Sequence, residues 1–119
     1  MRIRFLGKGG SGGGQCPTLY ATDHGSYLVQ GWQTDTAGTI EIPHLLIGFA
    51  EPDTFIGATM TDTDRGTFLV SGRPVTDTAT LAQLDLAEDE TAIEVPKRER
   101  KFYGAAAARG SILESVRAG

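Results

Sequence analysis

The chain contains the same eleven-residue pattern twice, and this repetition limits the possible folds more than any other feature. Residues 22–32 read TDHGSYLVQGW and residues 63–73 read TDRGTFLVSGR, with six identical positions at an offset of 41. A later segment, IEIPH at 40–44, returns as IEVPK at 93–97 with the larger offset of 53. The second copy therefore carries an insertion, roughly residues 80–90.

Each copy predicts a turn followed by strands. Asp-x-Gly before an apolar run favours a turn, because Asp bonds nearby backbone and Gly accepts positive φ. The following residues are rich in aromatic and β-branched types, as strands are, and Tyr27 alternates with Leu28, so both strand faces carry apolar groups. Pro43 should end the next strand and begin a short helical cap. Further strands are predicted at 2–7 and 54–60, and helical spacing at 78–90.

A two-stranded hairpin buries too little surface to be stable alone, whereas two packed copies supply one core. We therefore expect a single domain over 1–119 that is mainly β (β-rich α+β). Two pseudo-symmetric β-hairpin repeats, at approximately 15–50 and 56–103, should form a small antiparallel sheet, sandwich or barrel. The alanine-rich residues 104–119 predict a short C-terminal helix.

Composition narrows the function classes. The net charge of −4 disfavours broad binding to phosphate backbones. The lone Cys16 has no partner for an internal disulfide and by itself makes no zinc site. No apolar run is long enough to cross a membrane, and the N-terminus lacks a secretion signal, so the cytoplasm is the expected compartment.

Two glycine- or aspartate-rich motifs resemble ligand loops but lack essential parts. GKGGSG at 7–12 fits G-x-G-x-x-G, yet the residues that follow do not open a helix for a dinucleotide. TDTDRG at 61–66 begins like a calcium loop but lacks the third acidic position and the closing Glu. We therefore predict neither a cofactor nor a metal site.

Two alternative functions remain open. Cys16 with His24 or His44 could supply a nucleophile and a base, which would suit a small-molecule-binding or hydrolytic small β-barrel. PKRERKFY at 96–103 combines cations with aromatics, and nucleic-acid binding through 97–103 would follow from them.

Aromatic and arginine residues at exposed strand ends are typical anchors of protein interfaces. Trp32 and Arg73 end the two repeated strands at matching positions. Arg100 and Tyr103 lie in the basic segment near the C-terminus. The partner-binding residues predicted from the sequence are Trp32, Arg73, Arg100 and Tyr103.

The run SGGGQC at 11–16 resembles the opening of the small actinobacterial BldB-like family of unknown function, encoded beside WhiJ-type helix-turn-helix regulators. In that family two strands, a polar turn, an apolar-x-apolar strand and a short helix follow, and matching segments follow here in that order. The resemblance covers 5–50 loosely and 56–103 more faintly; Pro17 after the cysteine and QGW after the second strand depart from it.

The resemblance implies a non-enzymatic regulatory accessory protein. Such a protein would act through protein–protein contacts, with a helix-turn-helix regulator or as a toxin–antitoxin-like component. It would bind a protein partner or form a homodimer, and the resemblance supplies no catalytic residue.

Overall fold

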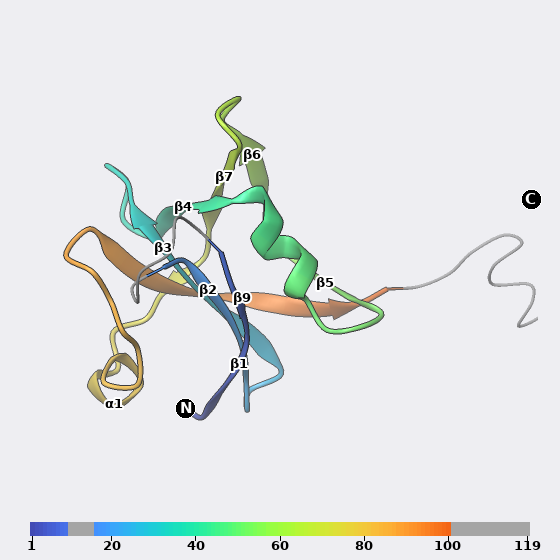
Figure 1. Cartoon of the computed structure of the whole chain (residues 1–119). Coiled ribbons are helices and arrows are strands. Elements are labelled where there is room, and N and C mark those ends of the chain that lie inside the picture. The colour runs from blue at the N-terminus through green and yellow to red at the C-terminus, as the bar shows by residue number, and fades with distance from the viewer. Residues whose placement is uncertain (10–15, 101–119) are drawn as a thin grey trace, which may run out of the picture.

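The structure is a computed structural model that describes residues 1–9 and 16–100. In these residues it is mainly β, with a nine-stranded antiparallel sheet and two short helices (Figure 1), so the expected fold class is confirmed. The strands are β1 (Ile3–Lys8), β2 (Thr18–Thr22), β3 (Ser26–Gln33), β4 (Thr39–Pro43), β5 (Thr54–Ile56), β6 (Met60–Asp62), β7 (Thr67–Ser71), β8 (Arg73–Pro74) and β9 (Glu90–Glu99). The helices are the 3-10 helix η1 (His44–Phe49) and the α-helix α1 (Thr78–Leu81).

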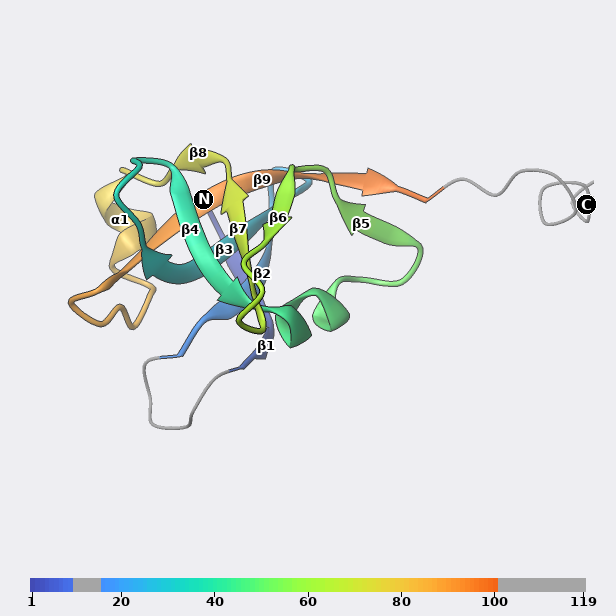
Figure 2. The same ribbon diagram turned by 90° about the horizontal axis from the view of Figure 1, so that it is seen from above.

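The sheet branches at its central strands. One path of neighbours runs β1-β2-β3-β4-β7-β6, and β9 pairs with β3, β5 and β8. Figure 2 shows β9 running the length of the sheet, with β5 toward the end of β9 that leads to the C-terminus. The long final strand therefore joins segments from both halves of the chain.

The two repeated segments pair in the same register. Leu19 lies opposite Val29 in the β2–β3 hairpin, and 41 residues later Met60 lies opposite Val70 in the β6–β7 hairpin. On the other edge β3 pairs with β9, and β7 pairs with β4. Each repeated strand thus lies mainly against a strand from the other half of the chain. Pairing of β3 with β4 inside the first half is confined to Trp32 and its neighbour Gln33, and the common origin of the halves stays a prediction.

Each repeated strand changes its pairing partner at a glycine. Gly31 separates the part of β3 that pairs with β2 from Trp32, which pairs with β4, and Gly72 separates β7, paired with β6, from β8, paired with β9. A Cβ at Gly31 would lie 2.7 Å from the backbone oxygen of Glu41, and one at Gly72 would lie 2.7 Å from that of Glu94. Only glycine therefore allows these strands to approach so closely.

The core lies on the face of β3 that carries Tyr27 and Val29. Leu28 and Gln30, on the opposite face, are also buried, so the predicted cover on both sides of this strand is confirmed. The carbonyl of Asp85 accepts a hydrogen bond from Gln30, which places the segment after α1 over the second face. The core cluster consists of Leu19, Tyr27, Val29, Ile40, Ile42, Leu46, Ile56, Val70, Ile93 and Val95.

Tight turns precede both repeated strands, as the Asp-x-Gly pattern predicts. Gly25 and Gly66 have φ values of 72° and 85°, in the left-handed region that favours glycine. The side chain that bonds the turn backbone is, however, a threonine rather than the expected aspartate. Oγ1 of Thr22 accepts a hydrogen bond from the N–H of His24, whereas Oδ1 of Asp23 accepts one from the N–H of Arg2.

The other helices and strands predicted from the sequence agree with the structure in whole or in part. β1 corresponds to the strand expected at 2–7, and Pro43 ends β4 immediately before η1. The strand expected at 54–60 is divided into β5 and β6, and helix within 78–90 is limited to α1. The predicted C-terminal helix at 104–119 lies outside the described residues. Across residues 1–9 and 16–100, no helix has the length and apolar character that crossing a membrane requires.

Candidate functional site

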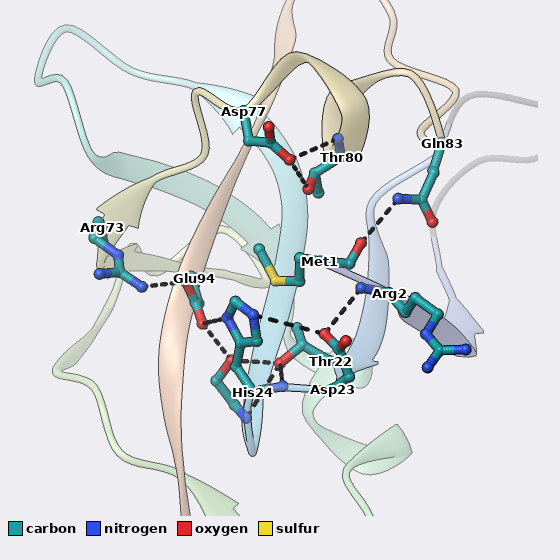
Figure 3. Close-up of polar contacts among 11 residues, drawn as sticks. Met1, Arg2, Thr22, Asp23, His24, Arg73, Asp77, Thr80, Gln83 and Glu94 are labelled. Carbon is teal, nitrogen blue, oxygen red and sulfur yellow. Dashed lines mark hydrogen bonds and ion pairs between the residues drawn. The ribbon is translucent and has the colours of Figure 1, made fainter.

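Charged side chains surround Glu94 where the turn before β3 meets β8 and β9 (Figure 3). Oγ of Ser26 donates to Oε2 of Glu94 at 2.5 Å, and the guanidinium of Arg73 donates to Oε1. Nδ1 of His24 lies 3.8 Å from Oε2. The Glu94 side chain is 10% exposed and that of Arg73 is 74% exposed, so a fixed carboxylate holds a cation at the surface.

The pKa of the Glu94 carboxyl lies below its ordinary value. Burial raises this pKa, but the hydrogen bonds from Ser26 and Arg73, together with the charges of Arg73 and His24, lower it further than burial raises it. Glu94 therefore remains a carboxylate near neutral pH and keeps its attraction for Arg73.

The start of the chain is tied to the same turn (Figure 3). The N–H of Arg2 donates to Oδ1 of Asp23 at 2.9 Å, and the N–H of Asp23 donates to the carbonyl of Arg2 at 2.9 Å. The bond from the Arg2 backbone is the main cause that lowers the pKa of the Asp23 carboxyl. Nε2 of Gln83 donates to the carbonyl of Met1 at 2.9 Å. The Glu94 cluster thus lies beside an anchored chain end.

A second cluster, around Glu41, has the same contacts in the other half of the sheet. Oγ1 of Thr67 donates to Oε2 of Glu41 at 2.6 Å, and the guanidinium of Arg65 donates to the same oxygen at 3.2 Å. Each cluster joins a strand-start hydroxyl, a glutamate and a basic residue from the preceding turn. Because the set occurs twice, its simplest role is to hold each turn against the neighbouring strand.

The two clusters differ at the residue after the glycine. Trp32 lies opposite Glu41 in the first cluster, and Arg73 lies opposite Glu94 in the second. The shared contacts do not need an arginine at this position, since the Glu41 cluster holds its turn without one. Arg73 is therefore the feature of the Glu94 cluster that a purely structural role leaves unexplained.

An open depression of about 500 Å³ borders the Glu94 cluster. Arg73, His24 and Lys97 contribute basic side chains to its lining, and Gly72 and Pro96 contribute small or apolar surface. A second depression of about 350 Å³ is also lined by His24 and Arg73 and extends to Met1 and Asp77. Arg73 and His24 therefore stand between two adjoining hollows.

The partner-binding residues predicted from the sequence are spread along β9. Trp32, half-buried, lies opposite Glu90, and Arg73 lies opposite Glu94. Arg100, exposed, follows the end of β9, where its N–H donates to the carbonyl of Asp53 at 2.8 Å. At about 3.3 Å per residue, positions 90 and 100 are roughly 30 Å apart, so these side chains form no single patch. Tyr103 lies outside the described residues.

Cys16 and His24, one of the pairs considered for catalysis, are not brought together. Cys16 is buried just before β2, whereas His24 follows its other end. An extended strand of this length separates its ends by roughly 16 Å. Among residues 1–9 and 16–100, no three His, Cys, Asp or Glu side chains gather as metal ligands.

Part of the basic segment is used inside the fold. Nζ of Lys97 donates to Oε1 of Glu51 at 2.6 Å and lies 5.5 Å from the centre of the Tyr27 ring. One cation of the segment expected to bind nucleic acid therefore holds β9 to the segment that follows η1, while 101–103 lie outside the described residues.

Sequence reasoning missed Glu94 as the centre of the site. The signal was present, because Glu94 occupies the place in IEVPK that Glu41 occupies in IEIPH. The pairing of each glutamate with a turn from the other half, however, depends on strand exchange, which the linear repeat does not encode.

Comparison with protein families, characterised proteins and solved structures finds no match to this chain. The resemblance to the BldB-like family accordingly stays a prediction.

Proposed function

We propose that the chain is a non-enzymatic regulatory accessory protein that binds another protein in the cytoplasm. The observation that carries the proposal is Arg73, an exposed arginine paired with the half-buried Glu94 between two open hollows. Arginine is enriched among the residues that dominate interface energies. Holding its side chain before binding reduces the entropy lost when a partner docks.

The chemistry of the hollow indicates what the partner presents. Glu94 already accepts from Arg73, whose remaining guanidinium N–H groups, together with His24, can donate outward. Gly72 and Pro96 leave room for a backbone to approach. A partner segment carrying carboxylates or free backbone carbonyls fits this surface. A helix-turn-helix regulator, a toxin–antitoxin-like partner and a second copy of this chain are the candidates.

Affinity capture with matched variants tests the proposal. The tagged protein and its Arg73→Ala variant are used to capture proteins from native lysate, while light scattering measures the mass of the purified protein. Arg65→Ala is the control, because Arg65 is also an exposed arginine paired with a glutamate, in the Glu41 cluster. We expect a specific partner, or a dimer, that is retained by wild type and Arg65→Ala and lost by Arg73→Ala. A monomer without a captured protein, or a partner bound equally by all three, would contradict the proposal.

A further inference from the structure

Strand β6 forms one end of the sheet. In the part of the chain that the structure describes, β6 pairs with β7 and with no other strand. The β6–β7 hairpin projects at the top of the view in Figure 1. One long edge of β6 therefore has no neighbouring strand among these residues.

The hydrogen-bond pattern shows which backbone groups of β6 lie on that outer edge. The N–H of Thr63 donates to the carbonyl of Thr67 at 3.0 Å, beside the β6–β7 turn. In an antiparallel ladder, hydrogen-bonded pairs recur at every second residue, so Thr61 also faces β7. The backbone N–H and C=O groups of Met60 and Asp62 accordingly point away from β7.

The equivalent edge in the other half of the sheet is occupied. The β2–β3 hairpin has the same register as the β6–β7 hairpin, and the outer edge of β2 pairs with β1. Arg4 of β1 lies opposite Ala21, which corresponds to Asp62 at the offset of 41. No described strand takes the place of β1 beside β6. The second half of the sheet thus leaves one strand position open.

Acidic side chains lie beside this open position. Residues 52–64 contain three aspartates and neither lysine nor arginine, and two of the aspartates, Asp62 and Asp64, lie at the end of β6. The Asp62 side chain is 53% exposed, and its Oδ1 lies 2.7 Å from Nε2 of His44. Because opposite charges on facing residues stabilise strand pairing, a basic strand fits this edge better than an acidic one.

We propose that the outer edge of β6 binds an extended basic segment of a partner protein as an added antiparallel strand. The backbone of that segment pairs with the outward N–H and C=O groups of Met60 and Asp62. An arginine or lysine of the segment lies opposite Asp62, as Arg4 lies opposite Ala21 in the other half. This edge shares no residue with the Arg73 surface, so the inference stands independently of the proposed function.

The probe is a peptide with the sequence of residues 1–9, MRIRFLGKG, with blocked ends, titrated into the isotope-labelled full chain and followed by NMR. We expect saturable shifts of the Met60 and Asp62 backbone amides, with a dissociation constant of about 1 mM. The same peptide with Arg2→Glu and Arg4→Glu keeps the apolar strand residues and should bind at least about tenfold more weakly.

Methylation of single peptide nitrogens tests the backbone pairing separately from charge. The N–H of Asp23 donates to the carbonyl of Arg2, so by alternation the N–H of Arg4 faces β2 and that of Phe5 faces away. If the peptide pairs with β6 as β1 pairs with β2, N-methylation at Arg4 should abolish binding. N-methylation at Phe5 should leave it unchanged.

Variants of the protein test the charge pair. Asp62→Lys should weaken peptide binding about fivefold, because a like-charge pair replaces an opposite-charge pair. Asp35→Lys makes the same charge change at an exposed aspartate between β3 and β4 and should leave binding unchanged.

Four outcomes would overturn the proposal. They are the absence of saturable shifts, shifts confined to β2, equal binding by the two methylated peptides, and equal binding by the Asp62→Lys and Asp35→Lys variants. Shifts of the Met60 amide with protein concentration alone would also overturn it, since they would assign the edge to a second copy of the chain. Without any binding, the charge of Asp62 would serve to protect the strand edge from pairing.

Discussion

Replacing Gly31 or Gly72 by alanine tests whether the close approach of neighbouring strands at these glycines stabilises the fold. Both glycines have φ values outside the left-handed region, so alanine meets no backbone strain, and only space decides its effect. The new methyl group at position 31 would lie 2.7 Å from the Glu41 backbone oxygen and 2.7 Å from Cγ2 of Ile42. At position 72 the corresponding distances, to the Glu94 oxygen and a Val95 methyl group, are also 2.7 Å.

The expected magnitude follows from this overlap. A carbon–oxygen contact of this kind normally lies at about 3.3–3.6 Å, so the strands must separate by roughly 0.6 Å or more. Overpacking of a well-packed site costs about 1–3 kcal/mol. The gain from stiffening the unfolded chain, about 0.4–1 kcal/mol, offsets part of that cost. The midpoint of this difference is about 1 kcal/mol, which is the expected loss in the free energy of unfolding for each substitution.

Thermal and urea unfolding, followed by circular dichroism, measure the effect. A loss of about 1 kcal/mol should lower Tm by roughly 4–8 °C for a domain of this size. Gly48→Ala is the matched control, because a Cβ there meets nothing within 4 Å and its φ is not left-handed. The two test variants should lose similar stability, and the control should stay within about 0.5 kcal/mol of wild type. Wild-type stability in both Gly31→Ala and Gly72→Ala would refute the reasoning.

Three further predictions concern stability and reactivity. The pKa values of Glu94 and Glu51 lie below the ordinary 4.5, so both carboxylates stabilise the fold above that pH. Their contribution is lost as the pH falls through the folded-state pKa values, so the urea midpoint should decrease below about pH 4.5. Glu94→Gln should make this decrease less steep, and an equally steep decrease in the variant would contradict the prediction. Tyr27→Phe should lower the free energy of unfolding by about 1–2 kcal/mol, because the Tyr27 hydroxyl accepts a hydrogen bond from the N–H of Glu51 at 2.7 Å and shares one with Thr54. Urea unfolding at neutral pH measures this loss, and an unchanged stability would count against these bonds. Buried Cys16 should react with a thiol reagent only at the rate of unfolding; fast labelling of native protein would show that the thiol is accessible.

Local chemistry in the sequence was sufficient for most individual elements. Alternation of Tyr27 with Leu28 predicted a strand covered on both faces, since successive side chains point to opposite sides. Gly25 and Gly66 marked the turns, because glycine tolerates positive φ. Pro43 marked the change from β4 to η1, because it lacks the N–H that a ladder needs. These signals act over a few residues and survive in any tertiary arrangement.

The charged contacts of the candidate site could not be derived in the same way. The repeat placed Arg73 at a strand end but gave no reason for it to meet Glu94 rather than Glu41. The hydrogen bond from Gln30 to the carbonyl of Asp85 likewise depends on how the segment after α1 folds over β3. Such contacts join residues far apart in the chain, and their geometry exists only once the whole sheet has formed.

Three properties of this protein were determined by the sequence alone: its high β content, the positions where its repeated strands begin, and the strand faces that carry apolar side chains. These properties follow from residue type and spacing. The tertiary structure alone decided that β3 pairs with β9 and β7 with β4. The physical reason is that a strand edge accepts any neighbour in register, so the choice among possible partners belongs to the packing of the complete core.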